Sequence, residues 1–217
     1  MDERTSGLNI GSVTHDFHER LEFSARLSDE LSWNAFYQGL WPDMVAATRL
    51  DRNSEWQRDG IDRVIFLANG RQLLVDEKKR EATDKKTGKP YLDVLLEEWS
   101  VFHGEGSHRN KIGWSLDRKK RCDFIAYSIP LAERCYMLPF ELLRLAFETR
   151  RSDWAREYGF RHSQNQGYVT RNIPVPWKEV QIAILREMNR RFASPSGLEL
   201  PTPFMVKDQL TFRWGTE

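Results

Sequence analysis

Two short acidic segments on either side of an apolar turn hold the residue types best suited to chemistry. Asp62 precedes one apolar run, and Asp76, Glu77 and Lys78 end the run that returns toward it. Two opposed carboxylates repel each other, whereas Mg²⁺ is commonly held by one or two carboxylates together with water and phosphate. A lysine beside such a metal can act on the attacking water or stabilise charge building on a phosphate. These residue types predict metal-dependent cleavage of a phosphodiester.

The spacing around Asn69-Gly70 predicts that these side chains meet. An Asn-Gly pair between two apolar runs is a strong signal for a β-hairpin. Asp62 lies eight residues before Gly70 and Asp76 lies six residues after it, within one or two residues of being paired. Because side chains alternate along a strand, Asp76 and Lys78 are expected on the same face.

An acidic residue two positions before a lysine is a common pattern in a charged protein. It occurs here at Asp76/Lys78, Glu77/Lys79, Asp84/Lys86 and Asp117/Lys119. Only the first two pairs end an apolar run, where the charges either line a site or mark the point at which a strand reaches solvent. The pair Glu77/Lys79 would use the opposite face of the strand, and we favour Asp76/Lys78.

The elements that position these residues follow from the hydrophobic periodicity. Helical patterns cover residues 17–25 and Asp29–Gln38, and further helices are expected from Pro139 onward and over Trp177–Arg190. Strands are predicted at Ile61–Leu67, Arg71–Lys79, Leu92–Val101, Asp123–Ile129, Arg134–Leu138 and Tyr168–Ile173, the first three as an antiparallel meander. A turn or short helix is expected at Gly113–Leu116.

These elements predict a single α/β domain over residues 1–217, with a mixed sheet and flanking helices. It would have N-terminal helices over 1–55, a core over 56–192 and an extended tail over 193–217. The 217 residues are 40% hydrophobic and 30% charged, which excludes a disordered chain and a coiled-coil rod. No apolar run is long enough to span a membrane, no secretory signal opens the chain, and the two cysteines lack CxxC spacing. We therefore expect a cytoplasmic protein.

The net charge of +1 conceals an asymmetry. Residues 1–62 hold 6 arginines and 12 carboxylates, a local net charge of −6, so the remainder carries +7. Basic residues gather at Lys85, Lys86 and Lys89, and again at Arg109, Lys111, Arg118, Lys119 and Lys120. Such clusters are usually solvated faces and favour a polyanion only beside a site that needs one. Beside a hydrolytic site they predict phosphate contacts with nucleic acid.

At these residues the chain resembles the PD-(D/E)XK nuclease superfamily, in which a strand aspartate is followed by an acidic-x-Lys triplet. Asp62 matches the aspartate, and Asp76-Glu77-Lys78 matches the triplet. The wider pattern resembles uncharacterised phage and bacterial members over roughly Tyr37 to Leu185. Its motifs are Gln57-x-x-Gly60-Ile61-Asp62, Asp93-Val94-Leu95-Leu96-Glu97, Gly113-Trp114, Asp123-Phe124-Ile125-Ala126-Tyr127, Asn165-x-Gly167-Tyr168-x-Thr170 and Val175-Pro176.

The resemblance implies a restriction-endonuclease-like αβββαβ core and a nuclease dependent on Mg²⁺ or Mn²⁺, acting on DNA ahead of RNA. Members of the superfamily are often dimers when they cut both strands. Asp62 and Asp76 would hold the metal together with Glu77, for instance through its carbonyl, and Lys78 would be the catalytic cation. A further acidic ligand often comes from the first helix, for which Glu22, Glu30 and Glu55 are open and Glu55 is favoured. Gln57 would position water or phosphate, or cap a turn. Asp93 and Glu97 are expected in supporting roles rather than as metal ligands.

A second hypothesis is a protein that keeps this fold without catalysis, because fold does not fix function. It would bind nucleic acid or a partner protein, for example as a phage-encoded regulator or inhibitor. The acidic N-terminal third and the eight tryptophans suit a protein partner. A third, purely structural domain would leave Asp62, Asp76 and Lys78 as an exposed charge cluster.

Overall fold

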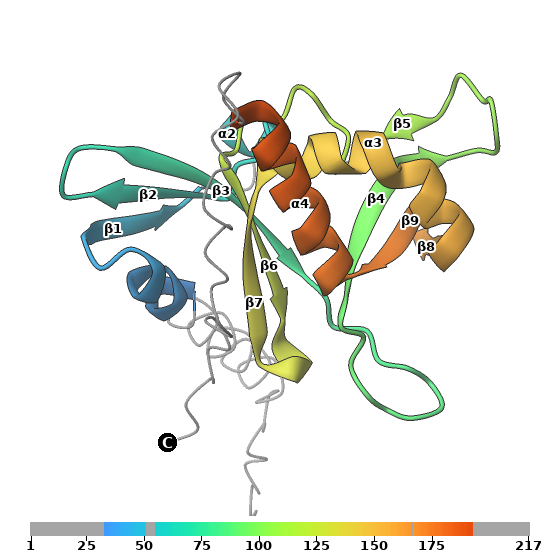
Figure 1. The fold of residues 1–217 in the computed structure, drawn as a ribbon, viewed down its shortest axis with the longest axis horizontal. Coiled ribbons are helices and arrows are strands. Elements are labelled where there is room, and N and C mark those ends of the chain that lie inside the picture. The colour runs from blue at the N-terminus through green and yellow to red at the C-terminus, as the bar shows by residue number, and fades with distance from the viewer. Residues whose placement is uncertain (1–32, 51–54, 166, 193–217) are drawn as a thin grey trace, which may run out of the picture. The chain divides into compact units, whose positions relative to one another are not determined.

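The computed structural model describes residues 33–50, 55–165 and 167–192 of the chain (Figure 1). The chain divides into two compact units, Met1–Pro42 and Asp43–Glu217. In the first unit, residues 33–40 are helical, and the buried rings of Trp33 and Tyr37 stack with centroids 5.7 Å apart. The predicted helix over 17–25, the start of the helix over 29–38 and the predicted tail over 193–217 lie outside the described residues.

The second unit is a mixed α/β fold, as predicted from the alternation of strand and helix patterns. In chain order its elements are β1 (Met44–Arg49), α2 (Glu55–Arg58), β2 (Arg63–Leu67), β3 (Gln72–Lys79), β4 (Asp93–Phe102), β5 (Lys111–Ile112), β6 (Phe124–Ile129), a 3₁₀ turn (Pro130–Ala132), β7 (Arg134–Pro139), α3 (Phe140–Tyr158), β8 (Arg161–Asn165), β9 (Tyr168–Pro176) and α4 (Trp177–Phe192).

The first sheet has the strand order β1-β2-β3-β6-β7 and carries the predicted hairpin. β1, β2 and β3 are antiparallel, β3 and β6 are parallel, and β6 and β7 are antiparallel. At the turn, Leu67 N–H donates to Arg71 O at 2.9 Å, and Gly70 takes a positive φ of 81°. Glycine adopts this conformation without the steric cost of a Cβ, so the Asn69-Gly70 signal is confirmed.

The second sheet, β5-β4-β9-β8, corrects the predicted meander. The strand expected over residues 92–101 is present as β4, but it pairs with β9 and not with β3. The third strand of the meander is instead β1, which pairs with β2. Neither β1 nor β8 was predicted from the sequence. All five side chains of β8 and four of the six of β1 are exposed, so neither strand has the apolar alternation that reveals a half-buried strand.

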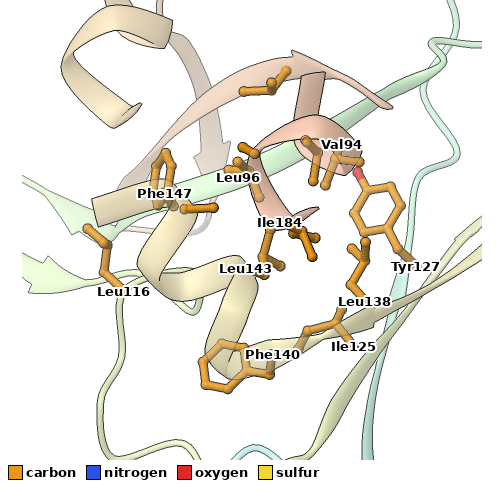
Figure 2. Packing of buried hydrophobic residues seen from close by; sticks show 14 of the residues in the cluster. Val94, Leu96, Leu116, Ile125, Tyr127, Leu138, Phe140, Leu143, Phe147 and Ile184 are labelled. Carbon is orange, nitrogen blue, oxygen red and sulfur yellow. The ribbon is translucent and has the colours of Figure 1, made fainter. Parts of the chain in front are cut away.

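One core joins the two sheets to the long helices. Figure 1 shows α3 and α4 lying side by side, and both pack against β9. In Figure 2, Leu143 and Phe147 of α3 and Ile184 of α4 lie among Leu96 of β4 and Leu138 of β7. Between the parallel strands β3 and β6, residues 80–123 hold β4, β5 and turns. Thus α3, which begins after Pro139 as predicted, is the first long helix after β3.

Candidate active site

The hairpin places Asp62 beside Asp76 at the open end of β2 and β3, where the two carboxyl groups interact. Arg63, the first residue of β2, pairs with Val75, and Asp62 comes directly before it in the chain. Asp62 N–H donates to Val75 O at 2.9 Å, and Asp62 Oδ2 accepts a hydrogen bond from Glu77 N–H at 2.8 Å. The backbone therefore holds Asp62 against β3, as the spacing around Gly70 predicted.

Asp76 lies on the face of β3 that faces the core. Its parallel partner in β6 is Ile125, and Lys78 is paired with Tyr127, both of them buried core residues. Asp76 is itself almost fully buried, and Lys78 Nζ donates to its Oδ1 at 2.6 Å. The shared strand face predicted for Asp76 and Lys78 is therefore observed.

A second lysine reaches Asp76 from the turn before β6. Lys120 Nζ lies 2.5 Å from Asp76 Oδ2 and 3.4 Å from Gly60 O, with its side chain 7% exposed. A Cβ at Gly60 would lie 2.2 Å from that ammonium, and Gly60 has a φ of 75°, so glycine is needed there for two reasons. Lys120 is one of the predicted phosphate contacts. The structure corrects this, because its ammonium is buried on Asp76.

The two carboxylates have opposite electrostatic environments. Burial, a hydrogen bond to Asp76 and repulsion from the Asp76 charge together raise the pKa of Asp62 to about 6. The hydrogen bond from Glu77 N–H and the charge of Lys78 act to lower it. Burial acts to raise the pKa of Asp76 too, but the Lys78 and Lys120 ammonium groups outweigh it and hold that pKa below its ordinary value. The charged form is thus favoured at Asp76, and Asp62 is the member of the pair that takes up a proton more readily.

Glu97 of β4 brings the second sheet into the site. Its carboxylate accepts a hydrogen bond from Trp114 N–H at 3.2 Å. Burial raises the pKa of Glu97, and the charges of Lys78, Lys120 and Asp76 all act on it. The backbones of Gly113 and Glu97 also approach each other closely, because a Cβ on Gly113 would lie 2.2 Å from Glu97 O. The Gly113-Trp114 turn therefore fixes Glu97 beside the lysines, in keeping with a supporting role.

Glu77 points away from this cluster. It follows Asp76 along the strand, so its side chain lies on the opposite face, where Arg63 Nε donates to its Oε1 at 2.6 Å. Only its backbone N–H reaches the site, through Asp62. The structure therefore brings together Asp76 and Lys78 rather than Glu77 and Lys79.

The remaining predicted groups lie elsewhere. Glu55 is exposed in α2, and Asp93 forms an ion pair with Arg80 at 2.9 Å. The side chain of Gln57 and all of Glu22 and Glu30 lie outside the described part of the chain. Among the described residues, no three His, Cys, Asp or Glu side chains gather into a group that could hold a metal ion. A cation at this site would therefore rest on two carboxylates.

A cavity of about 270 Å³ opens beside Lys78, in the angle between β3 and β6 of one sheet and β4 and β9 of the other. Glu97 and Trp114 line this cavity near Asp76, and Asn172 lines it on the side of β9.

The predicted phosphate contacts are exposed on the loop before β4 and around β5, namely Lys85, Lys86, Lys89, Arg109, Lys111, Arg118 and Lys119. Of these, Arg118 already forms an ion pair with Glu148 at 3.0 Å.

The raised pKa of Asp62 gives a direct test of this geometry. In EDTA, we expect its carboxyl group to titrate at about 6, as measured by ¹³C NMR. This folded-state pKa exceeds the unfolded value, so protonation of Asp62 adds to the free energy of unfolding as the pH falls below 6. That contribution is lost as the pH rises through 6. In Asp76→Asn, both contributions from the Asp76 carboxylate disappear, so the midpoint should fall. A wild-type midpoint near the ordinary aspartate value would contradict the arrangement.

None of the described helices is long and apolar enough to cross a membrane. Comparison of the chain with protein-family models, with curated proteins and with solved structures finds no match. The function of the protein is therefore inferred from the geometry of Asp62, Asp76, Lys78 and Lys120.

Proposed function

We propose that this protein is a nuclease that hydrolyses phosphodiester bonds with Mg²⁺ or Mn²⁺, acting on DNA ahead of RNA. The observation that carries the proposal is the placement of Asp62 beside Asp76, with Lys78 Nζ 2.6 Å from Asp76 Oδ1 on the same strand face. The PD-(D/E)XK resemblance of these residues, and the restriction-endonuclease-like core that it implies, belong to the same proposal.

The donor atoms fit a hard divalent cation. Asp62 and Asp76 contribute the two carboxylates. With the nearby charge of Glu97 and the two ammonium groups of Lys78 and Lys120, the ionised groups carry one net negative charge. Mg²⁺ favours one or two carboxylates and keeps several waters. Asp62 and Asp76 would hold it, and the metal would supply Lewis acidity at the phosphate.

Lys78 has the properties of an electrostatic catalyst rather than of a general base. Burial acts to lower its pKa, but the Asp76 carboxylate outweighs burial and raises it, so the amine stays protonated. Its side chain is 31% exposed, against 7% for Lys120, and it borders the cavity. Lys78 can therefore turn from Asp76 toward a phosphate and stabilise the negative charge that builds there during hydrolysis.

The exposed basic residues on the loops around β4 and β5 suit the substrate. Lysine and arginine contacts to phosphates provide affinity with little sequence preference, because the backbone carries no sequence information. Binding through them should weaken steeply as the salt concentration rises.

A second candidate function is supported by one specific observation. Both carboxylate oxygens of Asp76 already contact an ammonium group, Oδ1 with Lys78 and Oδ2 with Lys120. A cluster compensated in this way is stable without a metal, as expected of a protein that keeps the fold and only binds nucleic acid or a partner protein.

A cleavage assay separates the two functions. The wild-type protein is incubated with linear, circular and single-stranded DNA and with RNA, each in Mg²⁺, Mn²⁺ or EDTA. Cutting that needs the metal supports the nuclease. Intact substrates throughout, with circular dichroism showing folded protein, would favour the binding function, and titration of labelled DNA would then test for binding.

A further inference from the structure

We propose that Lys120 is a built-in counter-ion of the site, which occupies one cation position on Asp76 and limits how tightly the carboxylates hold a divalent metal. This inference rests on the proposed function in so far as it concerns a metal. It assigns a role to a side chain that the sequence could not separate from its basic neighbours.

The contacts of Lys120 are those of a bound cation. Its ammonium lies 2.5 Å from Asp76 Oδ2 and 3.4 Å from Gly60 O, so its two neighbours are a carboxylate and a carbonyl oxygen. These are the oxygen types that a divalent metal uses as well. The missing side chain at Gly60 leaves the space that the ammonium fills, because a Cβ there would lie 2.2 Å from Nζ.

Lys120 is the fixed cation of the pair, and Lys78 is the movable one. The Lys120 side chain is almost as buried as Asp76, and the turn that carries it is tied down, since Arg121 N–H donates to Asp59 O at 3.0 Å. Lys78 borders the cavity and is about a third exposed. A metal that binds Asp76 would therefore displace Lys78 from Oδ1, while Lys120 remains on Oδ2 and repels it.

Metal affinity tests this directly. Mn²⁺ binding is measured by calorimetry and by electron paramagnetic resonance at pH 8, without substrate, for wild type and Lys120→Met. Removing a fixed positive charge next to the metal should tighten Mn²⁺ binding about tenfold or more. The matched control is Lys178→Met, the same change at an exposed lysine of α4, and it should bind like wild type. Equal affinity in wild type and Lys120→Met would overturn the proposal.

A double-mutant cycle in EDTA tests the counter-ion role without any metal. Lys120→Met, Asp76→Asn and the double variant are unfolded with urea. Because Lys120 and Asp76 are in contact and buried, their effects on the free energy of unfolding should not add, and the double variant should be more stable than the sum of the single losses predicts. Additive losses would overturn the proposal.

The two measurements also separate this inference from the proposed function. If neither wild type nor Lys120→Met binds Mn²⁺ while the cycle shows coupling, metal-dependent catalysis fails and the claim that Lys120 limits metal affinity falls with it. The coupling would then establish Lys120 as the counter-ion of Asp76 in a binding protein. If wild type cuts DNA but the cycle is additive, the nuclease stands and the role given to Lys120 is wrong.

Discussion

Lys78→Met is expected to lower the rate of metal-dependent cleavage about 10²- to 10³-fold, the range found when one charge-stabilising group is removed from an active site. Methionine keeps most of the length of the lysine stem but cannot offset charge on the phosphate. Lys78 is the more exposed of the two lysines on Asp76, and Lys120 remains there when it is gone, so the fold should survive. Single-turnover cleavage of labelled DNA in Mg²⁺ measures the effect.

Asp76→Asn should abolish detectable cleavage, because the amide removes the charge on which both the metal and Lys78 depend. Its matched control is Asp84→Asn, which has the same acidic-x-Lys spacing but lies in the loop before β4, where Asp84 accepts hydrogen bonds from Lys86 N–H and Thr87 N–H. Near-normal cleavage by Lys78→Met or Asp76→Asn, or an equal loss in Asp84→Asn, would contradict the assignment of the site.

The buried pair on the other face of β3 should dominate the stability of this sheet. Arg63 and Glu77 are 1% and 9% exposed and lie 2.6 Å apart. Arg63→Met removes the guanidinium that faces the buried Glu77 carboxylate, and the loss of one partner of a buried pair typically costs about 3–5 kcal/mol. Urea denaturation should show a decrease of that size in the free energy of unfolding.

The compensating control is the double variant Arg63→Met/Glu77→Leu. Replacing both charges with apolar groups of similar volume is often neutral, so the double variant should recover most of the lost stability. Because this pair lies on the face opposite Asp76, the double variant should also keep its Mn²⁺ affinity. A single variant within about 1 kcal/mol of wild type would show that the pair contributes little.

Short-range features were predictable because neighbouring residues determine them. The Asn69-Gly70 turn fixes the register of β2 and β3, and that register brings Asp62 to the side of β3, close to Asp76. The apolar spacing after Pro139 likewise predicted α3. The alternation of side chains also implied that Glu77 and Asp76 would lie on different faces.

Long-range partners were not predictable from the same patterns. The strand over residues 92–101 was recognised, but nothing in its own residues shows that it pairs with β9 rather than β3. Lys120 lies 44 residues from Asp76 in the chain. It stands in a basic run, Arg118 to Arg121, in which no local signal marks the one side chain that turns inward.

The close approach between Gly60 and Lys120 restricts how this chain can diverge. Any side chain at position 60 has to adopt a positive φ and also meet the Lys120 ammonium. A substitution at Gly60 therefore carries two separate costs, and a shorter residue at position 120 would remove only the second of them. Position 60 is therefore expected to stay glycine in relatives of this protein even where position 120 changes.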